Sequence, residues 1–387
     1  MKKAYFVVDH TLPTDHPNGI RIANLGRIFK LAGYDVHLIG FHYSSTCHQI
    51  YDGMKAVLCQ ERSGSGFKTS VIRGREQLVA LKSYFVENGN PDVVVSGLFN
   101  CPMQRFLMRY CKKHKIDLIE SVCEWYDRNI FVGMKGVVKF LDNRFSLYVQ
   151  LPRFKKIIAI ATLQASYYEK KGCMTMVVPT IVDVEEYASN VRLEVGDSEK
   201  MKIAYAGSPG RKDYILNAVY ALPQLSREEL AKIEIHFYGP EIKAFYDLGL
   251  TEEFLDTYKD NIFCHGRIPY AEVKEKIAAA DFTVLLRPNK RYANAGFPTK
   301  VGESMACGTP VIANITSDLG KYIIDGKTGI VCENESPEAC AEAFRRALAM
   351  TADEKTEMRK AAYEMANVGF NYLSYVDAMR EFLEKAI

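Results

Sequence analysis

The residues best suited to chemistry lie between positions 287 and 313, which read RPNKRYANAGFPTKVGESMACGTPVIA. Lys300 and Glu303 stand at the start of an expected short helix after a Gly-Phe-Pro turn, and Gly308 ends that helix before a strand opened by Pro310. The first N–H groups of a helix are unpaired and suit a phosphate, while a nearby carboxylate can accept hydrogen bonds from ribose hydroxyls. The combination indicates a nucleotide-sugar site.

A second loop could hold a diphosphate. Residues 203–206 form an expected strand that runs into Gly-Ser-Pro-Gly-Arg-Lys-Asp at positions 207–213 and then into a helix. Glycines let the backbone approach a phosphate, and Arg211 or Lys212 could neutralise a pyrophosphate. Taken alone, the loop fits an ordinary tight turn with a solvated basic pair better.

Arg287 follows an expected strand at 282–286, and alone it would be an ordinary surface charge. It lies, however, in the same half of the chain as Lys212, Lys300 and Glu303, and all four follow strands. Coincidence is then the weaker explanation, because ligands bind at the carboxyl ends of the strands in open parallel sheets.

Alternating strand and helix patterns supply the elements that would position these residues. Residues 4–8 form an expected strand, an apolar helical repeat runs to Gly33, and a strand returns at 36–39. Further expected strands lie at 93–95, 118–119, 157–160, 176–178, 203–206, 233–237, 282–286 and 311–313. Ser336 and Pro337 open a helix to about 350. The polar stretch 179–200 has no sustained period and is the expected linker, so the pattern predicts an α/β fold of two doubly wound, Rossmann-like lobes facing a cleft.

Composition narrows the function class. The 387 residues, 48% of them hydrophobic, can fill two cores, and a net charge of +3 gives no argument for nucleic acid as the main partner. The ten cysteines show no C-x-x-C pair or zinc spacing, which favours free thiols in a reducing, cytoplasmic compartment. The N-terminal apolar stretch is too short for a signal peptide, and no uncharged apolar run could span a membrane.

The motif Ala-Gly-Phe-Pro-Thr-Lys-x-x-Glu-Ser-Met-Ala-Cys-Gly-Thr-Pro-Val-Ile-Ala closely resembles the donor-site signature of family 4 glycosyltransferases, which are retaining enzymes of the GT-B fold. The segment 205–213 resembles the phosphate loop of their polysaccharide-building members. The likeness is looser in the first half, where it rests on residues 19–22 and 124–127. It implies an acceptor-binding domain at 1–185, a donor-binding domain at 201–369, and a helix at 370–387 that crosses back to the first domain.

The resemblance also assigns roles. Glu303 would bind the donor ribose, Lys212 the phosphate, and N–H groups near Gly296 and Phe297 would face the donor sugar. The loop 265–269 would hold the base. The resulting substrate-binding set is Gly19, Arg21, Asp127, Gly207, Ser208, Arg211, Arg267, Ile268, Gly296, Phe297, Lys300 and Glu303. No cofactor or metal is implied, because cations and helix dipoles would stabilise the leaving diphosphate of the nucleotide sugar.

Two positions depart from the family pattern. Ala295 stands where many members carry a first glutamate near the transferred sugar, and Gly207-Ser208 replaces the usual Gly-Arg. Arg211 or Arg287 could substitute for that arginine. The expected catalytic residues are Lys212 and Arg287 at the diphosphate, together with Glu124 at the acceptor, and no enzymatic nucleophile is nominated.

The first lobe would bind the acceptor. Glu120, Glu124 and Asp127 could orient an acceptor hydroxyl, or they could equally be solvated carboxylates; His10 and Arg21 are weaker candidates. Residues 134–156 and 105–115 interleave basic and apolar side chains. Each could lie on an anionic membrane that carries a lipid-linked acceptor, and each could equally be a packed helix with a solvated basic face.

Three other functions compete with the transferase. A sugar-nucleotide epimerase of the same fold would act through first-lobe acids without an acceptor. A non-catalytic nucleotide-sugar-binding subunit is raised by Ala295. An NAD-dependent oxidoreductase is disfavoured, because the first strand-helix turn lacks G-x-G-x-x-G.

Overall fold

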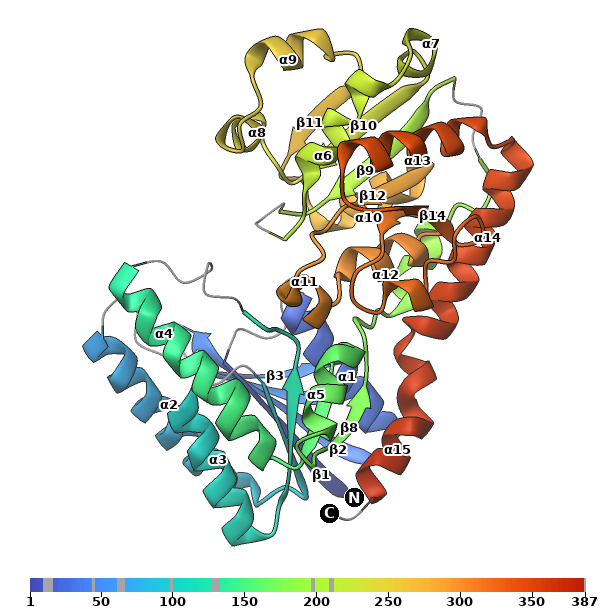
Figure 1. Cartoon of the computed structure of the whole chain (residues 1–387). Helices are drawn as coiled ribbons and strands as arrows, with labels where there is room; N and C mark the ends of the chain where they lie inside the picture. The colour runs from blue at the N-terminus through green and yellow to red at the C-terminus, as the bar shows by residue number, and fades with distance from the viewer. Residues whose placement is uncertain are drawn as a thin grey trace. The chain divides into compact units, whose positions relative to one another are not determined.

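A computed structural model of the chain describes residues 1–9, 17–43, 46–60, 67–97, 100–126, 133–195, 199–208 and 212–385. The chain divides into two compact units (Figure 1). The first comprises Met1–Ile181 and Tyr372–Ile387, and the second comprises Val182–Asn371. The last helix, α15 (Val376–Glu384), therefore belongs to the same unit as the first strand.

The sheet of the first unit has the order β3-β4-β2-β1-β5-β6-β7-β8, with β3 and β4 antiparallel and the remaining neighbours parallel. Its strands are β1 (Lys2–Val8), β2 (Tyr34–Tyr43), β3 (Cys47–Tyr51), β4 (Met54–Gln60), β5 (Val93–Gly97), β6 (Asp117–Val122), β7 (Lys156–Ala159) and β8 (Met174–Val177). Its helices besides α15 are α1 (Pro17–Leu31), α2 (Phe67–Asn88), α3 (Cys101–His114), α4 (Gly133–Phe145) and α5 (Thr162–Glu169).

Both faces of this sheet are covered, because successive residues of β1 point to opposite sides. Phe6 packs edge to face on Phe29 of α1, with ring centroids 5.0 Å apart. The preceding side chain, Tyr5, points to the other face and packs on Phe85 of α2, with ring centroids 5.4 Å apart. Met379 and Phe382 of α15 join the core on the Phe6 side. The first unit is thus a layer of helices, a sheet and a second layer of helices.

The second unit holds a parallel sheet in the order β11-β10-β9-β12-β13-β14. Its strands are β9 (Met201–Ala206), β10 (Ile233–Tyr238), β11 (Ile262–Gly266), β12 (Phe282–Leu285), β13 (Val311–Asn314) and β14 (Gly329–Cys332). Its helices are α6 (Ile215–Tyr220), α7 (Arg227–Leu230), α8 (Ile242–Asp247), α9 (Glu252–Thr257), α10 (Tyr270–Ala279), α11 (Arg291–Ala295), α12 (Thr299–Ala306), α13 (Pro337–Ala349) and α14 (Ala352–Gly369).

Helix α12 is fixed to this sheet by a buried polar chain. The hydroxyls of Thr283 on β12 and Ser304 on α12 lie 2.7 Å apart, and Ser304 Oγ also donates to Thr309 O at 2.7 Å. Each of the three residues is buried, so the hydrogen bonds remove the desolvation penalty of the hydroxyls and fix the register of α12. The helix that carries Lys300 and Glu303 is therefore rigidly placed.

The predicted strand-helix alternation is confirmed, and Ser336 caps α13 by accepting from the Ala339 N–H at 3.2 Å. The first segment of the first unit runs to Ile181, close to the predicted boundary at 185. Within the expected linker at 179–200, a 3-10 helix, η4 (Val184–Asn190), belongs to the second unit. The polar composition of this stretch hid two buried anchors, Val184 and Tyr187.

Candidate functional site

Three glycines mark the carboxyl ends of neighbouring strands in the second sheet. Gly207 follows β9, Gly239 follows β10 and Gly266 closes β11, with φ angles of +121°, +116° and +65°. The Gly207 N–H donates to Tyr238 O at 2.8 Å, and the Gly239 N–H donates to Gly266 O at 2.7 Å. A Cβ on Gly207 would lie 2.8 Å from Lys300 Cε. This edge is bare backbone, the kind of surface that phosphate groups approach closely.

A buried carboxylate, Asp213, joins the segment between β9 and α6 to α12 and to the end of β12. Its Oδ2 accepts from Lys300 Nζ at 2.8 Å and from the Tyr205 hydroxyl at 2.9 Å, and its Oδ1 lies 3.2 Å from Arg287 Nε. Burial would raise the pKa of Asp213, but Lys300 and Arg287 hold that pKa below its usual value. One carboxylate between two cations leaves a net positive charge at this edge of the sheet.

Arg287 is held by its backbone. Its N–H donates to Asn314 Oδ1 at 2.8 Å, and Asn314 Nδ2 donates to the Arg287 carbonyl at 2.7 Å. The guanidinium is buried, with 5% of the residue exposed, and its Nη1 has no hydrogen-bond partner among the described residues. A buried donor without a hydrogen-bond partner is rare in native proteins, and this one is consistent with donation to an oxygen of a bound ligand.

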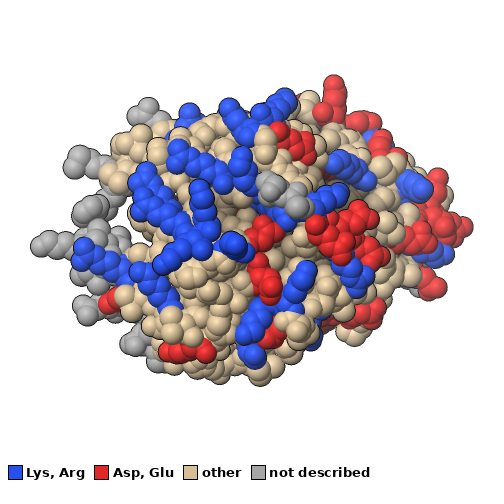
Figure 2. Space-filling model, turned by 90° about the horizontal axis from the view of Figure 1, so that it is seen from below, with Lys and Arg blue, Asp and Glu red and all other residues tan. Residues whose placement is uncertain are grey.

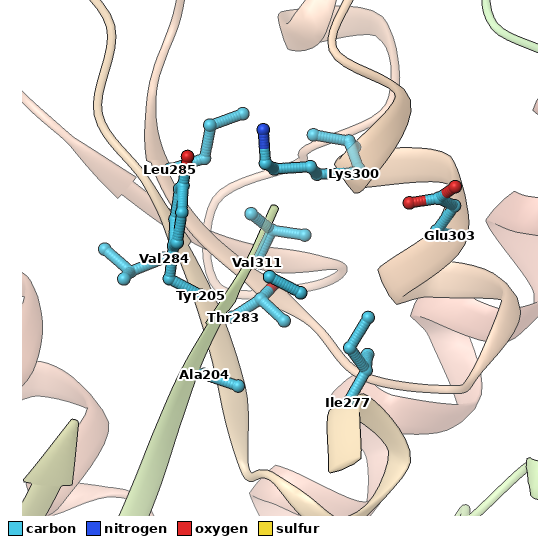
Figure 3. A pocket seen from close by; sticks show the side chains of 11 residues that line it. Ala204, Tyr205, Ile277, Thr283, Val284, Leu285, Lys300, Glu303 and Val311 are labelled. Carbon is cyan, nitrogen blue, oxygen red and sulfur yellow. The ribbon is translucent and has the colours of Figure 1, made fainter. Parts of the chain in front are cut away.

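The Glu303 carboxylate lies at the end of a chain of hydrogen bonds through two tyrosine hydroxyls. Its Oε1 accepts from the Tyr270 hydroxyl at 3.2 Å, and the Tyr187 hydroxyl lies 3.1 Å from that of Tyr270. Burial raises the pKa of Glu303, although Lys300, Tyr270 and Lys274 act in the opposite direction. Lys300 and Glu303 line one small pocket, and Figure 3 shows both projecting from the same helix, with Lys300 directed toward Tyr205.

The remaining predicted donor contacts fall around this edge. Gly296 and Phe297 are buried between α11 and α12, and the Phe297 ring packs against Tyr322 and Phe370 at 5.4 and 5.7 Å. Ser208 is exposed beside Gly207, and Lys212 is half-buried next to Asp213. In the base loop, Arg267 is exposed and Ile268 packs against the apolar cluster of Ala204, Tyr238 and Ala280.

Ala295 is fully buried within α11. The position that carries an acid in many family members is therefore filled here by a small apolar side chain inside the packing. Restoring a carboxylate there would bury a charge, which is costly unless a partner pairs with it.

The predicted first-lobe residues divide into different roles. Arg21 on α1 is 3% exposed, and its Nη1 donates to Val178 O at 2.8 Å and to Pro179 O at 2.6 Å. Burial lowers the pKa of Arg21 to about 10. These contacts give Arg21 a structural role at the end of β8. Gly19 is buried in the first turns of the same helix.

Glu120 lies within β6 and is 3% exposed, whereas the sequence placed it after the strand. Glu124 is half-buried in the segment that follows β6, next to a fully packed Trp125. Asp127, Arg211 and His10 lie outside the described residues, so their predicted roles are untouched by the structure.

Sequence reasoning assigned no role to Asp213, Tyr205, Tyr270 or Tyr187. Asp213 was visible as an acid at the end of a loop already noted for its cations, and that juxtaposition was the signal. Tyr270 and Tyr187 gave no comparable signal, because their partners are distant in sequence. Tyr187 lies 83 residues from Tyr270.

Residues 192–365 match the model of the family described as glycosyl transferases group 1. The matched segment lies within the second unit and covers somewhat less than half of the chain. The glycine edge, Asp213 and Glu303 all lie inside this matched segment. An uncharacterized glycosyltransferase of Methanocaldococcus jannaschii is 20% identical over 215 residues, which cover 54% of this chain. The match spans about half the length of that curated relative, 51%.

Solved structures of low sequence identity share the fold of this chain. Sucrose-phosphate synthase from Thermosynechococcus elongatus aligns with a TM-score of 0.71 and 15% identity, over 98% of each chain. Anabaena HepE in complex with UDP-glucose aligns with a TM-score of 0.64 and 12% identity, over 99% of each chain. Together with the two parallel sheets, these likenesses confirm the predicted GT-B fold.

Within the described parts of the chain, no helix combines the length and the apolar character needed to cross a membrane. All ten cysteines are free thiols. The prediction that no metal or cofactor takes part stays a prediction.

Proposed function

We propose that this protein is a retaining, metal-independent glycosyltransferase of the hexosyltransferase type. It would transfer a sugar from a nucleotide-diphosphate donor to a glycan or lipid-linked acceptor in surface polysaccharide biosynthesis. One observation carries the proposal: the half-buried Glu303 and the Asp213–Lys300–Arg287 cluster meet at one glycine-lined edge of the sheet in the segment that matches the group 1 model. The residues proposed to bind the ribose and those proposed to bind the diphosphate are thus adjacent.

The donor contacts follow from the chemistry of each group. Glu303 Oε1 accepts from Tyr270, and the remaining lone pairs of the carboxylate suit the two ribose hydroxyls. Lys300 is one helical turn before Glu303, so the two side chains share a face of α12. Lys300, Arg287 and Lys212 would surround the diphosphate, and Arg267 and Ile268 would lie at the base. UDP-glucose is the first donor to test, because HepE was solved with it.

Catalysis would come mainly from electrostatics. Negative charge grows on the leaving diphosphate as the sugar becomes oxocarbenium-like. Cations already fixed by Asp213 and by the Asn314 amide need little reorganisation when that charge develops, which is how preorganised sites lower a barrier. The first unit would bind the acceptor, with Glu124 and Asp127 as candidate ligands of its hydroxyl. We place the reaction in the cytoplasm, at the inner face of the cytoplasmic membrane.

The proposal is tested by incubating the purified protein with a panel of nucleotide sugars. One donor is expected to raise the melting temperature, since a ligand at 100 times its Kd stabilises the folded state by about 2.7 kcal/mol. With an acceptor, that donor should release its nucleoside diphosphate, and the product should keep the anomeric configuration of the donor. No stabilisation by any nucleotide sugar would contradict the proposal.

The buried Ala295 favours one alternative, a subunit that binds nucleotide sugar without transferring it. That alternative predicts stabilisation by a donor without nucleoside diphosphate release under any acceptor tried. An epimerase would instead convert the nucleotide sugar with no acceptor present. The same panel therefore separates the three functions.

Gly207→Ala is expected to weaken donor binding about 10-fold, because the new Cβ would displace Lys300. Gly249→Ala is the matched control, since Gly249 also has a positive φ, +104°, but nothing lies within 4 Å of its added Cβ. Both variants should lose about 1–2 kcal/mol of unfolding free energy to backbone strain. Urea unfolding and donor titration measure the two effects, and equal donor affinity in the two variants would refute the predicted role of the glycine.

A further inference from the structure

The two basic segments of the first unit form a single surface. Helices α3 and α4 lie side by side, because Gln104 Nε2 donates to Ser146 Oγ at 2.8 Å just beyond α4. The Cys101 N–H at the start of α3 also donates to Asp142 Oδ1 of α4 at 3.4 Å. We call the exposed side of this pair the α3–α4 face.

A stripe of large apolar side chains is exposed on α4. Val137, Val138, Leu141 and Phe145 are 50%, 59%, 61% and 39% exposed. Their spacing places them along one side of the helix. Single exposed apolar residues are common on soluble proteins, but four on one helical stripe form a patch that marks an interaction surface.

Basic side chains border this stripe. Helix α3 has no acidic residue, and its exposed cations are Arg105, Arg109, Lys112 and Lys113. Helix α4 adds exposed Lys139 and Arg144. Its single acid, Asp142, accepts a hydrogen bond from the Cys101 N–H at the start of α3. Figure 2 shows lysine and arginine side chains gathered on the side of the molecule where α2, α3 and α4 lie in Figure 1.

The cations and the apolar stripe are in contact. The Arg105 guanidinium lies 5.5 Å from the centroid of the Phe145 ring, and Arg144 lies 4.6 Å from that of Tyr148. Guanidinium groups held beside aromatic rings can bind lipid phosphates while the rings enter the headgroup boundary. Neither the charge nor the apolar surface alone would select a bilayer, but the combination matches an anionic one.

We propose that the α3–α4 face docks the protein on an anionic membrane surface. This proposal rests on the proposed function only in the purpose that docking would serve, which is to bring the protein to a lipid-linked acceptor. The binding itself needs neither donor nor acceptor. Val137, Val138, Leu141 and Phe145 would enter the headgroup region, and the cations of α3 would pair with lipid phosphates.

Co-sedimentation of the full chain with vesicles tests the proposal. Binding is expected with vesicles of 30% phosphatidylglycerol in phosphatidylcholine, and it should fall at least 10-fold between 0.1 and 0.5 M NaCl. Arg109→Gln with Lys112→Gln should weaken it about 30-fold, at about 1 kcal/mol for each cation near the surface. The control Lys243→Gln with Lys259→Gln, which removes two exposed cations of the second unit, should change it less than 2-fold.

The apolar stripe is tested by Val138→Asp with Leu141→Asp, which should abolish sedimentation with the anionic vesicles. Val368→Asp with Leu373→Asp introduces the same charge at two other exposed apolar residues and should retain binding. Equal binding to pure phosphatidylcholine, or loss of a dimer in light scattering by the α4 variant, would overturn the proposal, the latter by assigning the face to a second copy. Thermal stabilisation by a nucleotide sugar should be the same in all four variants, so failure here leaves the donor site unaffected.

Discussion

Glu303→Ala is expected to weaken nucleotide-sugar binding about 30-fold while the fold stays intact. Hydrogen bonds to a charged group contribute about 1.5–3 kcal/mol each, and a loss of about 2 kcal/mol is about 30-fold in Kd. Glu303 is only half-buried, and its replacement leaves no buried cation without a partner, since Lys300 keeps Asp213. Isothermal titration with the donor, alongside urea unfolding, measures both parts.

Tyr270→Phe supplies a graded version of the same test. It removes the hydroxyl that donates to Glu303 Oε1 and should weaken donor binding about 5-fold, near the net value of one hydrogen bond. Tyr220→Phe, on the other side of the sheet, should have no effect. Unchanged donor affinity in Glu303→Ala would remove the carboxylate from the donor site.

The raised pKa of Glu303 adds a pH dependence. The ionised carboxylate is the better acceptor, so donor affinity should fall as the pH drops through this pKa, at a higher pH than for an ordinary glutamate. The groups facing Glu303 are Lys300 on α12, Tyr270 and Lys274 on α10, and Tyr187 on η4. Tyr270 lowers the pKa, so Tyr270→Phe should move the midpoint upward.

Asp213→Asn is expected to destabilise the second unit by about 3–5 kcal/mol and to reduce turnover more than 100-fold. Removing one partner of a buried ion pair leaves the other charge uncompensated, here Arg287 and the Lys300 ammonium. The loss in turnover follows because both cations would leave the positions in which they meet the diphosphate. Urea unfolding at pH 7 and steady-state kinetics are the measurements.

Glu357→Gln is the matched control for Asp213→Asn, since its carboxylate pairs with Lys360 at 2.8 Å but is 72% exposed. Its expected cost is below about 1 kcal/mol. The pKa of Asp213 is lowered in the folded protein, so its contribution is present above the unfolded pKa and is lost as the pH falls through the folded pKa. This loss of stability at low pH should be absent in Asp213→Asn. Equal stability of the two variants would contradict the role of Asp213 as the central anchor.

The fold, which is confirmed, and the donor residues, which stay predictions, were both proposed from patterns that are local in the sequence. Strand-helix alternation is a short-range pattern, and Lys300 and Glu303 are separated by one helical turn. Asp213 escaped because its importance depends on Arg287 and Lys300, which are 74 and 87 positions away and reach it only in the folded unit. The carbonyl partners of Arg21 were not foreseen for the same reason, since they lie 157 and 158 residues further on. The role of Arg21 as a ligand stays a prediction.

The basic segments show a different limit. Each of them, read separately, fitted a solvated helix as well as a membrane helix. Only the packing of α3 against α4 shows that the cations of one helix border the exposed apolar stripe of the other. The amphipathic surface belongs to the pair and is not contained in either helix alone.

The central claim is that the carboxyl edge of the second sheet binds a nucleotide-diphosphate sugar. The most direct test is a crystal structure of the protein with the donor that stabilises it most in the panel. We predict ribose hydroxyls within hydrogen-bond distance of Glu303, and the diphosphate against Gly207 and the Lys300–Arg287 pair. A nucleotide bound elsewhere, with Glu303 contacting only Tyr270, would contradict the account.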